Sequence, residues 1–413
     1  SGLITPSLEE MAHVASEMKR LNMKQPLLIG GATTSRAHTA IKIAPNTDGA
    51  VVYVPDASRA VGVATKLLSV DQRDGYMAEI VAEYKAVRSE HASRKGATMV
   101  TLEEARANRF TWNEPFSPTI PNQLGLQTLN PSLGDLALLI DWTPFFQSWD
   151  LAGRYPAILE NEVVGETARQ LFADAKKMLT SIINENWLSA RAVFGLYPAS
   201  AENEDIIIYA DESRTTELTR WVGLRQQHKQ PKGRFNLALA DFVGKRDYVG
   251  AFAVTAGHRI EERVAAFEAA NDDYSAIMLK SLADRLAEAA AEWLHLQIRT
   301  KYWGYANDES FTNSELINEQ YKGIRPAPGY PACPDHTAKR ELFALLDAPA
   351  NAGMLLTESC AMMPAAAVSG FYIGHPGATY FAIPKIGRDQ LEDWAARKDM
   401  AIKDAEYWLA PLL

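Results

Sequence analysis

Two short apolar runs near the start of the chain, QPLLIGG (25–31) and GAVVYVPDASR (49–59), have the composition of buried parallel strands. Helical patterns surround these two runs. A capping box of Ser7 and Glu10 opens the first helix, and residues 36–43, 59–69 and 72–93 supply the others. This alternation of strand and helix predicts a partial Rossmann-like, doubly wound α/β domain over residues 1–93.

Small residues follow both predicted strands at the edge where a doubly wound sheet binds its ligands. Gly30 and Gly31 end the first strand, and Ala57 follows the second. Glycine at this edge lets the backbone approach a bulky ligand closely. The alternative is a plain strand-to-helix turn. It is favoured by the spacing of the glycines, which does not match the GxGxxG pattern of dinucleotide-binding loops.

The rest of the chain has a different pattern. Residues 94–134 carry scattered prolines with little periodicity, which predicts a semi-rigid interdomain connection. Over residues 135–413 helices and strands do not alternate strictly, so a larger α+β domain with an antiparallel sheet is expected. Helices are predicted at 161–184, 259–270, 273–301, 387–397 and 401–409, and strands at 191–196, 205–210, 235–241, 248–254, 353–362, 366–373 and 379–384.

Composition excludes several classes of protein. The length of 413 residues exceeds one ordinary core and favours two or more domains. The net charge of −9 argues against a general nucleic-acid binder, and no apolar run reaches the roughly 18 residues of a membrane helix. With Cys333 and Cys360 as its two cysteines, the chain has no disulfide framework, which favours the cytoplasm. Because it begins at Ser1 without a signal peptide, we expect a piece of a longer protein.

A proline-rich run, GIRPAPGYPACPDH (323–336), is too rigid for a helix or a central strand. Arg325 is suited to grip a carboxylate with two hydrogen bonds. The fixed carbonyls of the run and the N–H groups of Ala327, Gly329 and Tyr330 could read the edge of a planar base at little entropic cost. The alternative is a rigid surface turn with an ion-paired arginine. The Cys-x-x-His spacing at the end of the run resembles half a zinc site, which would need two further ligands.

Acidic residues occur beside aromatic side chains and on a long helix. Asp141 stands at the head of LIDWTPFFQSWDL (139–151), where an acid beside four aromatic rings could bind a cation. The alternative is a helix cap followed by an aromatic core stripe. Asp284 and Glu288 share one face of the helix at 273–301, and with Glu319 they could give a cleft a negative lining. A solvated helix face is the alternative.

A basic stretch covers residues 214–246 in an otherwise acidic chain. Its local excess of positive charge is a candidate docking patch for an acidic partner, with a solvated surface as the alternative. Its cationic side chains are Arg214, Arg220, Arg225, Lys229, Lys232, Arg234, Lys245 and Arg246.

Several motifs together resemble the C-terminal part of cobalamin-dependent methionine synthases. LLIGGATTSRAHTAIKI and VYVPDASRAVGVA resemble the second half of that family's cobalamin-binding domain, over residues 1–93. IDWTPFFQSW, DYVGAFAVTAG, YWGYA, GIRPAPGYPACPDH and TESCAMMPAAAVSGFYIGHP resemble its activation domain, over residues 135–413. The resemblance runs the length of the chain, and RPAPGYP is its most specific motif.

The resemblance implies a binding site for S-adenosylmethionine (AdoMet) in the activation domain. Matching positions are those that hold the polar groups of AdoMet, the contacts of the proline loop, a further contact strip and acids that line the site. They are Asp141, Arg325, Ala327, Gly329, Tyr330, Tyr380, Phe381, Glu288 and Glu319.

For cobalamin the resemblance implies an incomplete site in this chain. Ser1, Thr5, Gly30, Gly31 and Ala57 match positions around the nucleotide tail of the cofactor. The Asp-x-His-x-x-Gly loop that supplies the cobalt ligand in the family is absent from this sequence. The zinc-dependent homocysteine module and the folate module are absent too, so neither a metal ligand nor a catalytic residue is predicted here.

The expected function is therefore reactivation within a methyltransferase of methionine biosynthesis. The family moves a methyl group from methyltetrahydrofolate to homocysteine through cobalamin, and its activation domain uses AdoMet in a reductive methylation that restores the cofactor. We expect this chain alone to lack the overall activity. A flavodoxin-like electron donor is expected at residues 214–246, beside upstream modules of the same enzyme. Two alternatives stay open: a self-standing AdoMet-dependent methyltransferase, and a non-catalytic module that binds AdoMet or a corrinoid.

Overall fold

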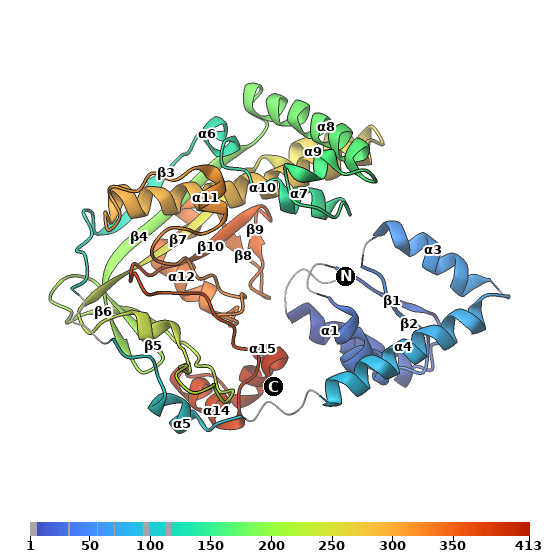
Figure 1. Cartoon of the computed structure of the whole chain (residues 1–413), viewed down its shortest axis with the longest axis horizontal. Coiled ribbons are helices and arrows are strands. Elements are labelled where there is room, and N and C mark those ends of the chain that lie inside the picture. The colour runs from blue at the N-terminus through green and yellow to red at the C-terminus, as the bar shows by residue number, and fades with distance from the viewer. Residues whose placement is uncertain (1–5, 32–33, 56, 70, 94–98, 113–116) are drawn as a thin grey trace. The chain divides into compact units, whose positions relative to one another are not determined.

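A computed structural model describes residues 6–31, 34–55, 57–69, 71–93, 99–112 and 117–413. The chain forms two compact units (Figure 1). The first unit comprises residues 1–102, 227–234 and 385–413, and the second comprises 103–226 and 235–384. No helix of the described residues combines the length and the apolar character needed to cross a membrane.

The N-terminal part of the first unit is built on a pair of parallel strands, β1 (Leu27–Ile29) and β2 (Val51–Tyr53). Both lie inside the two apolar runs of the sequence. Side chains of the pair enter two separate cores, one that includes Ala15 and Ile43 and another that includes Leu67. Helical segments therefore cover both faces of the pair. They are α1 (Pro6–Arg20), α2 (Arg36–His38) with the π-helical turn Thr39–Ile43, α3 (Ala57–Leu68) and α4 (Arg73–Ser93).

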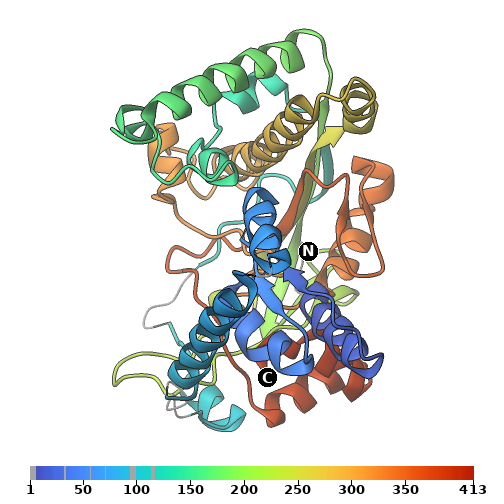
Figure 2. The ribbon, with the colours of Figure 1, turned by 90° about the vertical axis from the view of Figure 1, so that its right-hand side faces the viewer.

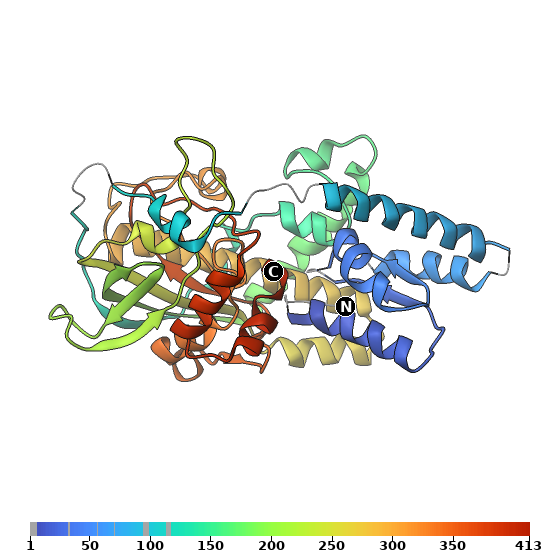
Figure 3. The same ribbon diagram turned by 90° about the horizontal axis from the view of Figure 1, so that it is seen from below.

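The C-terminal part of the first unit consists of α14 (Arg388–Arg397) and α15 (Ile402–Trp408), which pack side by side (Figure 3). The indole of Trp394 is fully buried there. The buried Gln227 side chain accepts a hydrogen bond from the Gly387 N–H and donates to Asp389. These bonds fix the 227–234 segment on the start of α14.

The second unit is built on a six-stranded antiparallel sheet in the order β10-β7-β4-β5-β6, with β3 paired to β4. This confirms the predicted α+β domain with an antiparallel sheet. The long strands β4 and β7 form its centre (Figure 1). The strands are β3 (Gly125–Leu129), β4 (Ser189–Glu202), β5 (Asp205–Tyr209), β6 (Glu217–Trp221), β7 (Asp247–His258) and β10 (Ala367–Tyr372).

Alternate residues of the central strands feed two cores, as the two-residue period of a strand requires. Phe194 and Phe252 enter a core made with the helices α6 to α10, whereas Val193 and Ala253 enter one made with α12 and α13. Figure 2 shows α8 and α10 on the same side of the sheet. The helices are α5 (Leu102–Ala107), α6 (Leu133–Ala137), α7 (Thr143–Ser148), α8 (Gly165–Asn184), α9 (Ile260–Ala269), α10 (Asp273–Gln297), α11 (Asn313–Ile317), α12 (Ala338–Leu346) and α13 (Ala348–Ala352).

Several predicted elements differ from the structure. The run 235–241 alternates like a strand but forms a loop with a 3-10 turn, because the buried Arg225 binds the Asn236 carbonyl and Asp241 within it. The predicted strand 353–362 is a small hairpin of β8 (Leu355–Leu356) and β9 (Met362–Met363), and 379–384 is not a strand. The predicted connection 94–134 carries α5 and β3, so its last part belongs to the sheet.

Candidate functional site

The proline-rich run forms an irregular edge segment beside β10. Ile324 and Ile373 exchange backbone hydrogen bonds of 3.0 Å, and the Phe371 N–H donates to the Pro326 carbonyl at 2.9 Å. Proline cannot donate, so the run pairs mainly through its carbonyls. On its other side the Ile383 N–H donates to the Pro331 carbonyl at 2.9 Å. The run is thus fixed between β10 and residues 379–384.

The turn at the centre of the run uses most of its own backbone donors. The Gly329 N–H donates to the Cys333 carbonyl at 2.7 Å, and the Tyr330 N–H donates to the Ala327 carbonyl at 3.1 Å. The prediction that these two N–H groups would read a base edge is therefore wrong for this structure. The phenol of Tyr330 is 59% exposed and stays accessible to a ligand.

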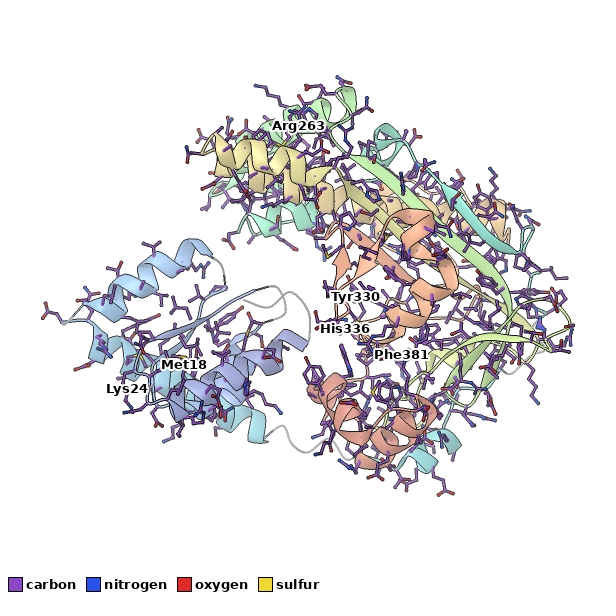
Figure 4. All side chains as sticks on the ribbon, turned by 180° about the vertical axis from the view of Figure 1, so that it is seen from behind. Met18, Lys24, Arg263, Tyr330, His336 and Phe381 are labelled. Atoms are coloured by element: carbon purple, nitrogen blue, oxygen red, sulfur yellow. The ribbon has the colours of Figure 1, made fainter. Side chains whose placement is uncertain are left out.

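Gly329 is required by both conformation and space. Its φ of +97° lies in the region that favours glycine, and a Cβ there would lie 2.3 Å from Cε1 of His336. His336 is buried and accepts a hydrogen bond at Nδ1 from Lys339, with 3.0 Å between the nitrogens. Burial, assisted by this lysine, lowers the pKa of His336 to about 4. A neutral imidazole therefore supports the turn; Figure 4 labels Tyr330 and His336.

The Cys-x-x-His pair does not form a metal site in the structure. Cys333 and Cys360 are buried thiols that form no disulfide. Among the described residues, no group of three or more His, Cys, Asp or Glu side chains is arranged to hold a metal ion.

Arg325 is held by a set of side chains from α10 and from the segment after α11. Its Nη1 lies 2.7 Å from Oε2 of Glu292, 3.0 Å from the Tyr321 hydroxyl and 3.3 Å from Nδ1 of His295. Its backbone N–H donates to the hydroxyl of Tyr380 at 3.0 Å. Since Glu292 and His295 are three residues apart, they lie on one face of α10. The guanidinium is therefore fixed at one edge.

His295 is a neutral acceptor in this arrangement. Complete burial, followed by repulsion from Arg299 and Arg325, lowers its pKa well below the usual value. Its partners imply that Nδ1 accepts from Arg325 while the Nε2 proton points to the Tyr305 hydroxyl, 3.5 Å away. Its ring also stacks on Tyr372, with 5.1 Å between the ring centroids. His295 thus supports Arg325 without adding charge.

Two predicted acids, Glu288 and Glu319, share the electrostatic field of Arg325. Both side chains are exposed to solvent, yet the surrounding protein raises the pKa of each, and Glu292 adds repulsion. Both carboxylates therefore contact water while they lie in the field of Arg325. The structure thus gathers Glu288 and Glu319 around Arg325, with Tyr330 and Tyr380 in the same field.

Asp141 lies at the start of α7 and lines a separate cavity of about 620 Å³. Its Oδ1 accepts a hydrogen bond from the Thr143 N–H at 2.9 Å, so it also acts as a local cap. Arg325 does not line this cavity. Asn318 of the wall directly precedes Glu319 in the chain, and the structure does not place Asp141 and Arg325 in one cavity. The neighbouring rings of Trp142, Phe145 and Phe146 are buried in the core.

The other predicted positions are less informative. Ala327 is half-buried, and Phe381, labelled in Figure 4, packs against the core on the α12 face of the sheet.

A Cβ on Gly30 would lie 2.7 Å from the Val54 carbonyl oxygen, and Gly31 has a φ of +119°. Packing within the chain therefore already requires glycine at Gly30. Ala57 begins α3, and Ser1 and Thr5 lie outside the described residues.

The basic stretch separates into buried and exposed residues. Arg225 is completely buried between Glu204 and Asp241, so its assignment to a docking patch is wrong. Arg214 and Arg220 are also engaged in ion pairs. Its exposed cationic residues are Lys229, Lys232, Arg234, Lys245 and Arg246.

Sequence reasoning missed Glu292, His295 and Tyr321, the partners of Arg325. A signal for Glu292 was present, because Asp284, Glu288 and Glu292 recur every four residues on α10. That spacing alone describes a solvated stripe equally well. It did not reveal that the last acid of the three is buried.

Comparisons with known proteins identify the family of the chain. The sequence model of a family described as "Vitamin B12 dependent methionine synthase, activation domain" matches residues 132–399. A solved structure described as "Crystal Structure of the MetH Reactivation Domain bound to AdoHcy" is 51% identical, with a TM-score of 0.75. The similarity covers 76% of this chain and 98% of that one. The chain therefore belongs to the vitamin B12-dependent methionine synthase family and contains its activation domain.

Proposed function

We propose that this chain is the C-terminal part of a methionine synthase and binds AdoMet for the reductive methylation that reactivates cobalamin. The observation that carries the proposal is Arg325, which stands on a rigid proline loop with one edge of its guanidinium fixed by the buried Glu292. Family membership and the AdoHcy-bound state of the similar structure support it.

The residues around Arg325 have distinct roles in this proposal. The free edge of the guanidinium binds the carboxylate of AdoMet by charge-assisted hydrogen bonds. Glu288, Glu319 and Asp141 favour its ammonium and sulfonium groups, and the exposed ring of Tyr330 offers a flat face to the adenine. Tyr380 fixes the backbone of Arg325, while Ala327, Gly329 and Phe381 form the adjoining wall. The protein thus binds and orients the methyl donor.

We further propose that residues 1–93 are the second half of a doubly wound cobalamin-binding domain, joined through 94–134 to an activation domain over 135–413. Cobalamin, when bound, supplies the cobalt that accepts the methyl group. The described residues do not form a complete site for it, because no histidine stands in an Asp-x-His-x-x-Gly loop. Residues upstream of this chain complete that site in our proposal. The two buried thiols, which form no disulfide, suit the reducing cytoplasm that we propose as its location.

Calorimetric and absorbance titrations of the chain test the function. AdoMet is expected to bind to one site, and the absorbance of added methylcobalamin is expected to stay unchanged because its binding site is incomplete. A self-standing methyltransferase would instead consume AdoMet in the absence of any corrinoid. Methylcobalamin bound by this chain with a spectral change would contradict the incomplete site, and absent AdoMet binding would contradict the function itself.

An electron donor is required for reductive methylation, and we propose an acidic, flavodoxin-like reductase as this partner. Exposed cations of the 214–246 stretch are the proposed contacts, with Lys229 and Lys232 in the first unit and Lys245 and Arg246 in the second. Opposite charges steer such encounters and weaken with ionic strength.

Charge reversal tests this docking one pair at a time. Replacing both Lys229 and Lys232, or both Lys245 and Arg246, by glutamate is expected to weaken binding of a reduced flavodoxin roughly fivefold or more at low salt. The difference should largely disappear at about 0.5 M salt, where charges are screened. The control reverses the exposed Lys176 and Lys177 of α8, an equal change in net charge. A flavodoxin affinity that changes neither with the charge reversals nor with salt would exclude these contacts.

A further inference from the structure

Four charged side chains form a row of alternating sign behind the proline loop. Glu309 binds Nε and Nη2 of Arg299 at 2.9 and 2.7 Å. Nη1 of Arg299 lies 3.8 Å from Oε1 of Glu292, whose Oε2 lies 2.7 Å from Arg325. The side chains of the first three residues are between 0 and 9% exposed, and that of Arg325 is 20% exposed. The row is therefore neutral as a whole and ends at the predicted ligand site.

The last pair of this row changes what Arg325 offers to a ligand. An acid at 2.7 Å cancels most of the positive charge of the guanidinium, while the described residues leave Nε and Nη2 without a protein partner. Arg325 thus keeps hydrogen-bond donors for a carboxylate but adds little net positive charge to the proposed ligand site. Because Glu292 is buried and contacts Nη1, it cancels the charge of Arg325 without blocking Nε and Nη2.

The surroundings of Arg325 carry an excess of negative charge. Asp284, Glu288, Glu292 and Glu319 interact electrostatically with one another or with Arg325, and the second guanidinium in this group is that of Arg285. Four carboxylates thus stand against two guanidinium groups, and the neighbouring Arg299–Glu309 pair adds no net charge, so the excess is two negative charges. Without Glu292 that excess would fall by half, and the charge of Arg325 would act on the ligand uncancelled.

We propose that Glu292 makes this site prefer a sulfonium ligand over the corresponding neutral thioether. AdoMet and AdoHcy share the adenosyl, ammonium and carboxylate groups and differ in one methyl group with its positive charge. A negative field stabilises this charge only in AdoMet. The methyl donor is thereby retained, and the demethylated product is released. This inference rests on the proposed function, because it concerns the same ligand at the same site.

The ratio of the two affinities tests the inference, since effects on the groups that both ligands share cancel in it. In the Glu292→Gln variant, the preference for AdoMet over AdoHcy is expected to fall roughly five- to twentyfold. This is the effect of one unit charge at a distance of about 9–17 Å at an effective dielectric constant near 20. Both affinities can be read from ligand-induced melting shifts, even where the variant is less stable.

Three further variants separate charge from structure. Glu292→Asp retains the charge at a changed distance and is expected to keep the ratio. Glu309→Gln removes a buried acid that pairs with Arg299 rather than Arg325, so its effect on the ratio should be smaller. Glu319→Gln removes an exposed acid with no cost to the core and should lower the ratio, which keeps the inference testable if Glu292→Gln does not fold.

Distinct outcomes would overturn the inference and the proposed function. If the unaltered chain binds neither ligand, the proposed function is wrong. If it binds both equally, or if Glu292→Gln keeps the original preference for AdoMet, AdoMet binding stands and the inference fails. If the ratio falls as far with Glu292→Asp as with Glu292→Gln, the effect comes from geometry rather than charge. That outcome would also overturn the inference.

Discussion

Replacing Arg325 by alanine is expected to weaken AdoMet binding by at least about 100-fold. A hydrogen bond to a charged group contributes about 1.5–3 kcal/mol, and a two-bond grip on the carboxylate is lost here. A loss of about 2.8 kcal/mol already corresponds to a factor of 100 in Kd. Isothermal calorimetry with AdoMet on the whole chain measures this change.

Two companion variants define the cause of that loss. Arg325→Lys retains the charge but not the planar fork, so its affinity should lie between those of the unaltered chain and Arg325→Ala. Arg263→Ala removes an exposed arginine of α9, labelled in Figure 4, and should bind AdoMet normally. An Arg325→Ala chain that remains folded and binds within threefold of the unaltered affinity would exclude the carboxylate contact.

Replacing Arg225 by methionine is expected to lower the free energy of unfolding by about 3–5 kcal/mol. Arg225 contacts Glu204 at 2.7 Å and both oxygens of Asp241 at 2.8 Å, and its removal leaves two acids without this cation in a buried place. Denaturant unfolding followed by tryptophan fluorescence measures the loss. The matched control is Arg388→Met, which removes an exposed arginine paired with the exposed Glu392 and should change stability by about 1 kcal/mol at most. A second comparison is Arg220→Met, which removes a partly exposed arginine that pairs with Glu202, Glu217 and the buried Asp205 and should give a loss smaller than that of Arg225→Met.

The loss at Arg225 should depend on pH in a defined direction. Burial would raise the pKa of Glu204, but hydrogen bonds from Arg106 and Arg225 outweigh it and lower this pKa below its ordinary value of 4.5. A carboxyl group whose pKa is lower in the folded state stabilises the fold above 4.5 and loses that contribution as the pH falls through the folded value. The difference in the free energy of unfolding between the unaltered chain and the Arg225→Met chain should therefore narrow at acidic pH. A gap that widens there, or an Arg225→Met chain as stable as Arg220→Met, would contradict this role of Arg225.

Local patterns predicted much of the fold because their physical cause is local. The apolar runs at 25–31 and 49–59 contain β1 and β2, and the periodicity at 273–301 became α10. The run at 235–241 also alternates like a strand. It does not form a strand, because the guanidinium of Arg225 binds the Asn236 carbonyl and the Asp241 carboxylate and draws both into a loop.

The sequence by itself determined the family, the antiparallel α+β domain and the proline loop that carries Arg325, because rigid prolines and specific motifs act over a few residues. Only the tertiary structure decided which charges are cancelled. Arg225 and Arg325 are both arginines in polar stretches, yet the first is buried between two acids and the second is open at one edge. Burial and ion pairing depend on neighbours brought together by folding, such as Glu292 beside Arg325, and spacing along the chain does not contain that information.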